Sequence, residues 1–543
     1  MKNKKIEGNI VDIFNRKIFK GEVEIENNKI KNIIENNNNN DYFILPGLID
    51  SHVHIESSML IPSEFSKLAI MNGTVGIVTD PHEIANVMGI EGIEFMIKNA
   101  KQSPLKCYFC VPSCVPTSEN EISGAVLDAE KVEFLFKNYN LKILGELMDY
   151  SGVINNNPEV YKKIKIAQKY NAVIDGHIPN IIGNDLEKYI SAGISTDHEC
   201  SYIEEAIDKI QKGMKIQIRE GSAAKNFDSL FPLITKYNKN IMLCTDDSHP
   251  DDLLEQGHIN KIIKKGLKLG INIFDLLTTT CINPVEHYKL DVGLLRKNDP
   301  ADFIIVDNLQ NFNILETNIN GETVFSNNRI LYNTQIEKPI NNFNTEKITI
   351  EDIEIKSSLQ KIKVIEVVDK ELITKCFYID PLIKNGKIIS DIKHDILKIV
   401  VYCRYKKEKA VVGFINGFGL QAGAIASSVS HDSHNIIAVG ADDESIVKSI
   451  NEIIENKGGL CYVKEKNFYT LALEFGGLMT GKSGETVAKM YKELNNVVKV
   501  NGCNLTAAFM TLAFMSLLVI PHLKINTKGI FDVDKYEFTK IFE

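Results

Sequence analysis

The sequence predicts an α/β protein built around a closed (β/α)8 barrel. Between residues 46 and 287, short apolar runs alternate with helical stretches. The clearest runs are Val75–Val78, Lys142–Leu144, Ala172–Ile174 and Ile241–Cys244. Strands that alternate with helices form a parallel sheet, and about 240 residues suffice for eight such units. The chain has 543 residues, and single cores stop growing beyond about 250–300 residues, so further domains must flank the barrel.

The segments on either side of the barrel carry the signals of short strands and turns. Residues 1–45 hold apolar runs that are broken by Asn-rich turns, and residues 288–337 show the same pattern. We therefore expect these two segments to form one small β-sandwich outside the barrel. A polar linker, Lys338–Lys347, then leads to a C-terminal α/β domain over residues 348–543.

Composition and charge exclude several functional classes. The chain has 62 Lys and Arg against 71 Asp and Glu, a net charge of −9, so it lacks the positive field that nucleic acid binding needs. Its ten cysteines show no disulfide spacing, which indicates a reducing compartment. The basic residues 1–5 are followed by Ile6–Asn9 rather than by the apolar run of a signal peptide. The apolar stretch Leu505–Ile520 is shorter than the roughly 20 residues of a membrane span. We expect a cytoplasmic protein without nucleic acid or membrane partners.

Potential metal ligands are predicted at one rim of the barrel. His52 and His54 end an apolar run, and two histidines at i and i+2 on a strand point to the same side. The polar residues that end later apolar runs are Glu146, His177, His198 and Asp246. Each alone is often an ordinary strand-end residue, but active sites of such barrels lie at the C-terminal ends of the strands. Four histidines with two carboxylates suit Mn²⁺, Fe²⁺ or Zn²⁺ and suffice for two ions.

Two other motifs have less specific interpretations. Gly476–Ser483 matches the phosphate-binding pattern GxxxxGK[ST], but too little chain follows for a nucleotide-binding core, so we interpret it as a Gly-rich turn. His431 and His434 in the C-terminal region either line the active site or shape a loop, and the sequence leaves both alternatives open.

The residues carry a resemblance to a known family. Pro46–His54, together with Gly176-His177, Asp197-His198 and Thr245-Asp246, resembles the amidohydrolase superfamily. Longer strings resemble the bacterial adenine deaminases within that superfamily: Ile55–Met59, Thr79–Glu83, Asp246–Leu253 and His431–Asn435. The resemblance covers nearly the whole chain. It implies a TIM-like metallo-barrel, a split β-sandwich, a family-specific C-terminal domain and, in purine salvage, the hydrolysis of adenine to hypoxanthine and ammonia.

The resemblance also implies residue roles. Divalent ions, with Mn²⁺ favoured and Fe²⁺ or Zn²⁺ as alternatives, would be bound by His52, His54, His177, His198 and Asp246. Glu146 would bridge two ions, where hydantoinase-like relatives use a carbamylated Lys. Asp246 also stands where the superfamily keeps its proton shuttle. Asp80 would contact the purine ring, while Glu83 and Glu199 would protonate the ring, orient a ligand or lie at the surface. The family further implies a homo-oligomer, a dimer or larger.

Two alternative functions remain at this stage. A cyclic-amide hydrolase of the hydantoinase or dihydroorotase type would carry a bridging Lys where this chain has Glu146, and it would lack the region after residue 348. A catalytically inactive scaffold would have lost ligands, and none of the six is missing. Both comparisons favour the adenine deaminase prediction.

Overall fold

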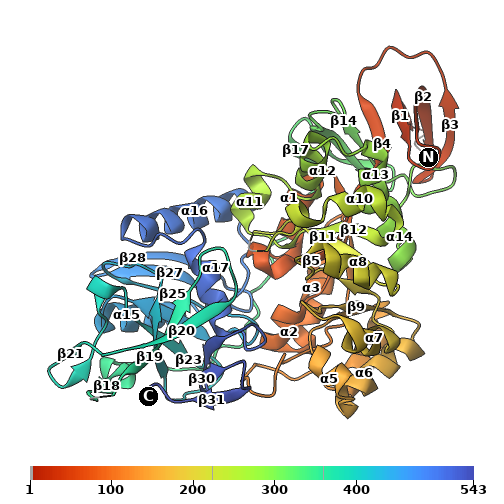
Figure 1. The fold of residues 1–543 in the computed structure, drawn as a ribbon. Coiled ribbons are helices and arrows are strands. Elements are labelled where there is room, and N and C mark those ends of the chain that lie inside the picture. Colours follow the sequence, from red (N-terminus) through yellow and green to blue (C-terminus); the bar gives the residue numbers. More distant parts are fainter. Residues whose placement is uncertain (1–3, 223, 359) are drawn as a thin grey trace. The chain divides into compact units, whose positions relative to one another are not determined.

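The computed structural model describes residues 4–222, 224–358 and 360–543, so the first three residues of the basic N-terminal segment lie outside it. The chain divides into two compact units (Figure 1). Unit 1 comprises Met1–Pro81, Phe95–Ser113 and Asp128–Ile336. Unit 2 comprises His82–Glu94, Cys114–Leu127 and Glu337–Glu543.

Unit 1 contains an eight-stranded sheet in the order β17-β16-β15-β14-β4-β1-β2-β3. The strands are β1 (Lys4–Asp12), β2 (Lys17–Glu26), β3 (Lys29–Glu35), β4 (Phe43–Pro46), β14 (Phe303–Val306), β15 (Ile314–Ile319), β16 (Glu322–Ser326) and β17 (Arg329–Ile330). β4 pairs in parallel with β1 and antiparallel with β14. It therefore joins the two segments that flank the barrel in sequence into one continuous sheet, and Ile10, Ile44 and Phe303 share its apolar core.

Parallel strands close into a barrel in the rest of unit 1. They are β5 (Leu48–His54), β6 (Thr74–Thr79), β7 (Lys106–Phe109), β8 (Ile143–Leu147), β9 (Val173–Gly176), β10 (Thr196–Asp197), β11 (Lys215–Arg219), β12 (Ile241–Cys244) and its continuation β13 (Asp246–Asp247). Neighbours pair in parallel, with single bridges from Val111 to Leu144 and from Ile174 to Ile194. β13 pairs with β5, which closes the ring. The predicted (β/α)8 barrel is confirmed, and β5, β6, β8 and β12 are buried throughout, as strands covered on both faces must be.

Helices follow the barrel strands and cover them (Figure 1). The longer ones are α1 (Pro62–Met71), α4 (Ala129–Tyr139), α6 (Pro158–Lys169), α7 (Gly183–Ser191), α8 (Ile203–Gln211) and α12 (Ile259–Lys268). The shorter ones are α5 (Tyr150–Ile154), α9 (Phe227–Leu230), α10 (Pro232–Lys236), α11 (Pro250–Glu255), α13 (Ile273–Leu277) and α14 (Asn283–Tyr288). Side-chain caps fix where some of them begin: Asp128 accepts a hydrogen bond from the Lys131 amide at α4, and Asn157 caps α6.

Unit 2 is the predicted C-terminal α/β domain, and it is built on a second eight-stranded sheet in the order β20-β19-β24-β23-β26-β25-β27-β28. These strands are β19 (Ile362–Val367), β20 (Thr374–Ile379), β23 (Leu397–Tyr402), β24 (Val411–Asn416), β25 (Ala424–Ser427), β26 (Ile436–Gly440), β27 (Gly459–Lys464) and β28 (Asn467–Ala472). Two small sheets accompany it, formed by β18 (Ile355–Lys356), β21 (Ile383–Lys384) and β22 (Lys387–Ile388), and by β29 (Leu523–Asn526), β30 (Gly529–Asp532) and β31 (Glu537–Thr539).

Helix α15 (Asp443–Glu455) packs on the large sheet of unit 2, where Ile446, Ile450 and Ile453 meet Val400 and Ala438. The other helices after the linker are α16 (Gly484–Val500) and α17 (Ala508–Ala513). Ser483 is the N-cap of α16, so the Gly-rich string before it ends as a helix-initiating turn. Within the described part of the chain, none of the helices combines the length and the apolar character that a membrane crossing requires.

Two segments that the sequence analysis places in the barrel belong to unit 2. One holds α2 (His82–Met88) and the start of α3 (Ile90–Ala100), and the other is Cys114–Leu127. Long-range hydrogen bonds explain the difference. The Asn342 side chain donates to the carbonyl of Val87, and the Asn435 side chain donates to the carbonyl of Ile122. Helical and strand periodicity carries no information about such distant partners.

Candidate metal centre

The six predicted ligands lie together at the C-terminal ends of the barrel strands. His52 and His54 end β5, Glu146 lies in β8, and Asp246 begins β13. His177 follows β9 directly and His198 follows β10 directly. All are buried except His177, whose side chain is 20% exposed. Strand ends from around the barrel thus bring four imidazoles and two carboxylates to one place.

One half of the cluster consists of His52, His54 and Asp246. The two Nε2 atoms of the histidines are 3.1 Å apart. Asp246 Oδ1 lies 3.6 Å from His52 Nε2 and 3.3 Å from His54 Nε2. His54 Nδ1 is 3.0 Å from the carbonyl oxygen of Asp80, so Nδ1 carries the proton and Nε2 keeps its lone pair for a cation. Donor atoms separated by these distances match neighbouring positions around one ion with bonds of about 2 Å.

The other half is centred on Glu146. Its Oε2 lies 2.9 Å from His177 Nδ1 and 3.2 Å from His198 Nε2. Its Oε1 lies 3.2 Å from His54 Nε2 and 4.0 Å from His52 Nε2. Burial would raise the pKa of Glu146, but the surrounding histidines hold it well below its ordinary value. Glu146 is therefore an ionised carboxylate that presents one oxygen to each half of the cluster.

Asp80, the predicted purine contact, lies directly behind Glu146. Its Oδ2 accepts a hydrogen bond of 2.9 Å from the Glu146 amide, and its carbonyl oxygen is the partner of His54 Nδ1. A Cβ atom on Gly145 would come within 2.0 Å of Asp80 Oδ2. Asp80 thus orients two of the potential ligands, and only glycine at position 145 leaves room for it.

Arg219 is a site residue that the sequence analysis missed. It ends β11 and is buried, with Nη1 2.7 Å from Asp246 Oδ2 and Nη2 2.8 Å from Glu199 Oε2. Burial would raise the pKa of Asp246, but the Arg219 guanidinium and the neighbouring histidines hold it well below its usual range. The sequence signal for Arg219 is its place at the end of barrel strand β11, since the other candidates follow from the same rule.

Glu199 is brought into the same cluster by this arginine. Its Oε1 lies 3.4 Å from His198 Nε2 and 3.6 Å from His177 Nδ1. Of the alternatives left open for Glu199, a surface position is therefore wrong. Its carboxylate faces the half of the centre that contains His177 and His198.

Glu83, the second predicted substrate contact, belongs to unit 2. It is buried on α2, with Oε1 3.3 Å from His431 Nδ1 and Oε2 3.8 Å from His434 Nε2. Burial would raise its pKa, but His431 and His434 lower it below the ordinary value. The two histidines of the C-terminal region thus hold Glu83 as a carboxylate.

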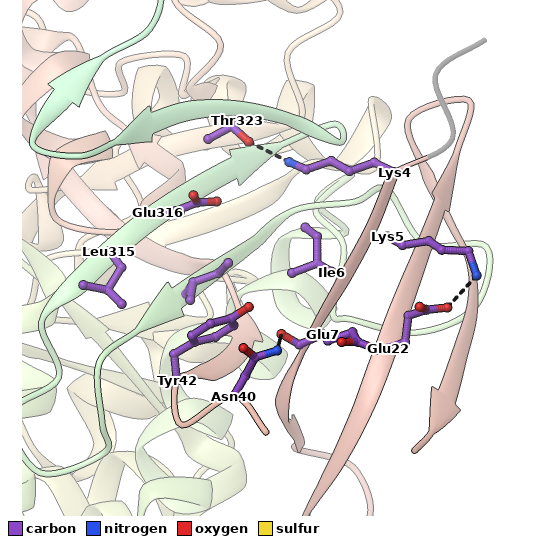
Figure 2. Close-up of a pocket in the computed structure, with 11 residues that line it drawn as sticks. Lys4, Lys5, Ile6, Glu7, Glu22, Asn40, Tyr42, Leu315, Glu316 and Thr323 are labelled. Carbon is purple, nitrogen blue, oxygen red and sulfur yellow. Dashed lines mark hydrogen bonds and ion pairs between the residues drawn. The ribbon is translucent and has the colours of Figure 1, made fainter. Parts of the chain in front are cut away.

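A pocket on the eight-stranded sheet of unit 1 contains none of the predicted site residues (Figure 2). Both of its lysines have partners within the lining: Lys4 Nζ donates to Thr323 Oγ1 at 2.6 Å, and Lys5 Nζ lies 2.8 Å from Glu22 Oε1. Because no histidine lines this pocket, the strand-end cluster with its four histidines remains the candidate active site.

Comparisons with known proteins show similarity over nearly the whole chain. The amidohydrolase family matches residues 43–324, and the adenine deaminase C-terminal domain matches residues 371–537. An adenine deaminase from Methanosarcina mazei is 52% identical over 551 residues, covering 99% of this chain and 99% of that protein. One from Borreliella burgdorferi is 49% identical over 542 residues, covering 98% of this chain and 99% of that protein. A solved structure of a β-aspartyl dipeptidase from Fervidobacterium islandicum has 17% identity and a TM-score of 0.47, covering 62% of this chain and 99% of its own.

Proposed function

The chain belongs to the adenine deaminase family of the amidohydrolases, and we propose that it hydrolyses adenine to hypoxanthine and ammonia. The observation that carries this proposal is the 52% identity to a curated adenine deaminase over 99% of both chains. Identity of this extent includes the C-terminal domain, which cyclic-amide hydrolases of the superfamily lack. Glu146 in the place of their bridging Lys also favours adenine over a cyclic amide.

The family implies a divalent metal site, and the donor set of the cluster fits one. We propose that the site holds two divalent ions, with Mn²⁺ favoured over Fe²⁺ or Zn²⁺. His52, His54 and Asp246 would bind one ion, and His177 and His198 would bind the other. Glu146 would bind both, in keeping with its two oxygens facing the two halves. Bound divalent ions lower the pKa of water to about 7 and so supply hydroxide at neutral pH.

The proton transfers fall to Asp246. In the reaction, a water oxygen forms a bond to C6 of adenine, the bond from C6 to the exocyclic nitrogen breaks, and that nitrogen leaves as ammonia. Asp246 accepts one proton from the attacking water and passes it to the departing nitrogen, and the second proton of that water ends on N1 of the ring, which gives hypoxanthine. Arg219 holds Oδ2 of this carboxylate, so Oδ1 is the oxygen directed at the histidines.

Substrate recognition is proposed for Asp80 and Glu83. Both are buried carboxylates, and carboxylates accept hydrogen bonds from N–H groups such as those of a purine. Asp80 is supported by its position beside Glu146, and Glu83 by the two histidines that keep it ionised. We also propose that the active form is a homo-oligomer, a dimer or larger. Light scattering of the purified protein measures its molar mass and so tests this.

The deciding experiment is an assay on purified protein reconstituted with Mn²⁺. Ammonia release and the loss of adenine absorbance are followed beside a His52→Ala/His54→Ala control, with hydantoin as a second substrate. Adenine turnover that disappears in the control is the expected result. Failure to turn over adenine in the metal-loaded protein would remove the substrate assignment, and opening of hydantoin would then support a cyclic-amide hydrolase.

A further inference from the structure

Lys209, on α8, is a fully buried ammonium group whose three donors are all used. It donates at 2.6 Å to the carbonyl oxygen of Ile178, at 2.9 Å to Asp197 Oδ2 and at 2.6 Å to Glu205 Oε1. An ammonium group has three N–H donors, so the lysine is saturated. The lysine reaches neither the protein surface nor the described cavity. Its partners lie next to the candidate metal centre.

Two of these partners adjoin metal ligands in the sequence. Ile178 directly follows His177, and Asp197 directly precedes His198. Asp197 Oδ1 also accepts a hydrogen bond of 2.9 Å from the Ile178 amide. The peptide groups of Ile178 are therefore held on both sides, the carbonyl oxygen by Lys209 and the amide by Asp197. The loop after β9 is tied in this way to the loop after β10.

Glu205 extends the same connection further along each loop. Its Oε1 accepts a hydrogen bond of 2.8 Å from the Asn180 amide, and its Oε2 accepts one of 3.3 Å from the Ser201 amide. Lys209 and Glu205 lie one turn apart on α8, and Lys209 Nζ joins Glu205 to Asp197. One helix thus contacts each of the two ligand-bearing loops.

The two halves of the metal centre differ in what fixes their histidines. His52 and His54 lie within β5, whose neighbours β6 and β13 hold it by strand pairing. His177 and His198 lie just beyond the last residues of β9 and β10, where no strand pairing holds them. Side chains hold them instead: the His177 amide donates to Tyr189 Oη at 3.1 Å, and Asn226 Nδ2 donates to the carbonyl oxygen of His198 at 3.1 Å. The Lys209, Asp197 and Glu205 side chains add a restraint on the residues that adjoin the two histidines.

We propose that Lys209 is a positioning residue that sets the affinity of the His177 and His198 half of the centre for its divalent ion. This inference rests on the proposed metal function. Groups that orient metal ligands from behind change metal affinity about 10- to 100-fold when they are removed. The effect is confined to one of two bound ions, because the half that contains His52 and His54 is held independently.

The test is a titration of chelator-stripped full-length protein with Mn²⁺, which requires no activity. Lys209→Met is expected to weaken one of two equivalents about 10- to 100-fold and to leave the other within about 2-fold. Lys212→Met is the matched control, since Lys212 follows the same helix, pairs with Asp208 and contacts neither loop. Equal weakening of both equivalents, or unchanged affinity beside a lowered melting temperature, would overturn the proposal.

A second variant covers the case in which Lys209→Met does not fold, since it leaves two buried carboxylates without their cation. Glu205→Gln keeps Lys209 and Asp197 and is expected to weaken the same single equivalent by a smaller factor. Wild-type protein that binds only one equivalent would overturn the inference itself. Wild-type protein that binds two equivalents but does not deaminate adenine would instead refute the substrate assignment and leave the role of Lys209 standing.

Discussion

Arg219 Nη1 lies 2.7 Å from Asp246 Oδ2, so one oxygen of the proposed proton shuttle is bound by the guanidinium. The same guanidinium binds Glu199, whose carboxylate faces His177 and His198. Arg219 therefore connects the carboxylates on opposite sides of the centre. Because Arg219 is buried, its positive charge acts on the Asp246 and Glu199 carboxylates in a medium of lower dielectric constant than water.

Replacing Arg219 with Gln is expected to lower kcat/KM for adenine by about 10²-fold, because Asp246 loses the partner that orients it for proton transfer. Lys at this position should give an intermediate loss, since an ammonium group lacks the planar fork that reaches two carboxylates. Because Arg219 also orients Asp246 as a proposed metal ligand, Mn²⁺ affinity is expected to fall by about 10- to 100-fold as well, so the kinetics are measured at saturating Mn²⁺. Steady-state kinetics measure kcat/KM, and metal analysis measures the bound Mn²⁺. The control is Arg296→Gln, which removes an exposed ion pair with Asp299. Unchanged kinetics for Arg219→Gln would contradict the assigned role.

Gly145→Ala tests the position of Asp80. The new Cβ would lie within 2.0 Å of Asp80 Oδ2, so the carboxylate must leave the Glu146 amide. We expect weaker Mn²⁺ binding and a free energy of unfolding lowered by about 1–3 kcal/mol, as overpacked buried sites show. Asp80→Asn, which retains an acceptor oxygen, should preserve more of the metal affinity than Gly145→Ala. Equal metal affinities in the two variants would speak against this arrangement.

The sequence predicts those parts of the site that obey the geometry of a single strand. His52 and His54 share one face because side chains alternate along β5, and Glu146, His177, His198 and Asp246 follow from the rule that barrel sites lie at strand ends. The barrel follows in the same way from alternating strands and helices. Arg219 obeys the same rule but was not singled out, because one charged residue at a strand end has many ordinary roles.

The remaining features depend on partners that are distant in sequence. Glu83 pairs with His431 and His434, more than 340 positions later in the numbering. Lys209 appears in the sequence as one more polar position of an amphipathic helix, and only the folded chain shows that it is buried between two loops. Periodicity reports which face of an element is buried, whereas the partner of a buried charge is determined by tertiary structure.

Glu146→Gln tests the bridging arrangement. Glutamine keeps the shape of the side chain but provides one acceptor oxygen and an NH₂ group, which repels a cation. We expect the Mn²⁺ stoichiometry to fall from two to one, with a loss of adenine turnover of at least about 10²-fold. Glu133→Gln, at an exposed pair with Lys169, should retain both properties. Two tightly bound equivalents in Glu146→Gln would exclude a bridge through this carboxylate.

Glu121 is expected to make the stability of unit 2 fall as the pH rises. Burial and, to a smaller extent, the charge of Asp432 raise the pKa of this carboxyl to about 8, although Ser433 and Lys528 partly oppose the shift. The folded chain therefore keeps a proton that the unfolded chain releases above the ordinary glutamate pKa of 4.5. The contribution of this group to the free energy of unfolding is fully present below that value and is lost as the pH rises toward about 8.

The measurement compares melting temperatures of wild type and Glu121→Gln at pH 5 and pH 8.5. Gln is neutral at both and can still accept from Ser433 Oγ. Its melting temperature relative to wild type should therefore be higher at pH 8.5 than at pH 5. Each pKa unit of the shift corresponds to about 1.4 kcal/mol, so the effect amounts to a few kcal/mol. Glu119→Gln, two residues earlier and exposed, should show no such pH dependence. A constant difference between Glu121→Gln and wild type would mean that the carboxyl titrates normally in the folded chain.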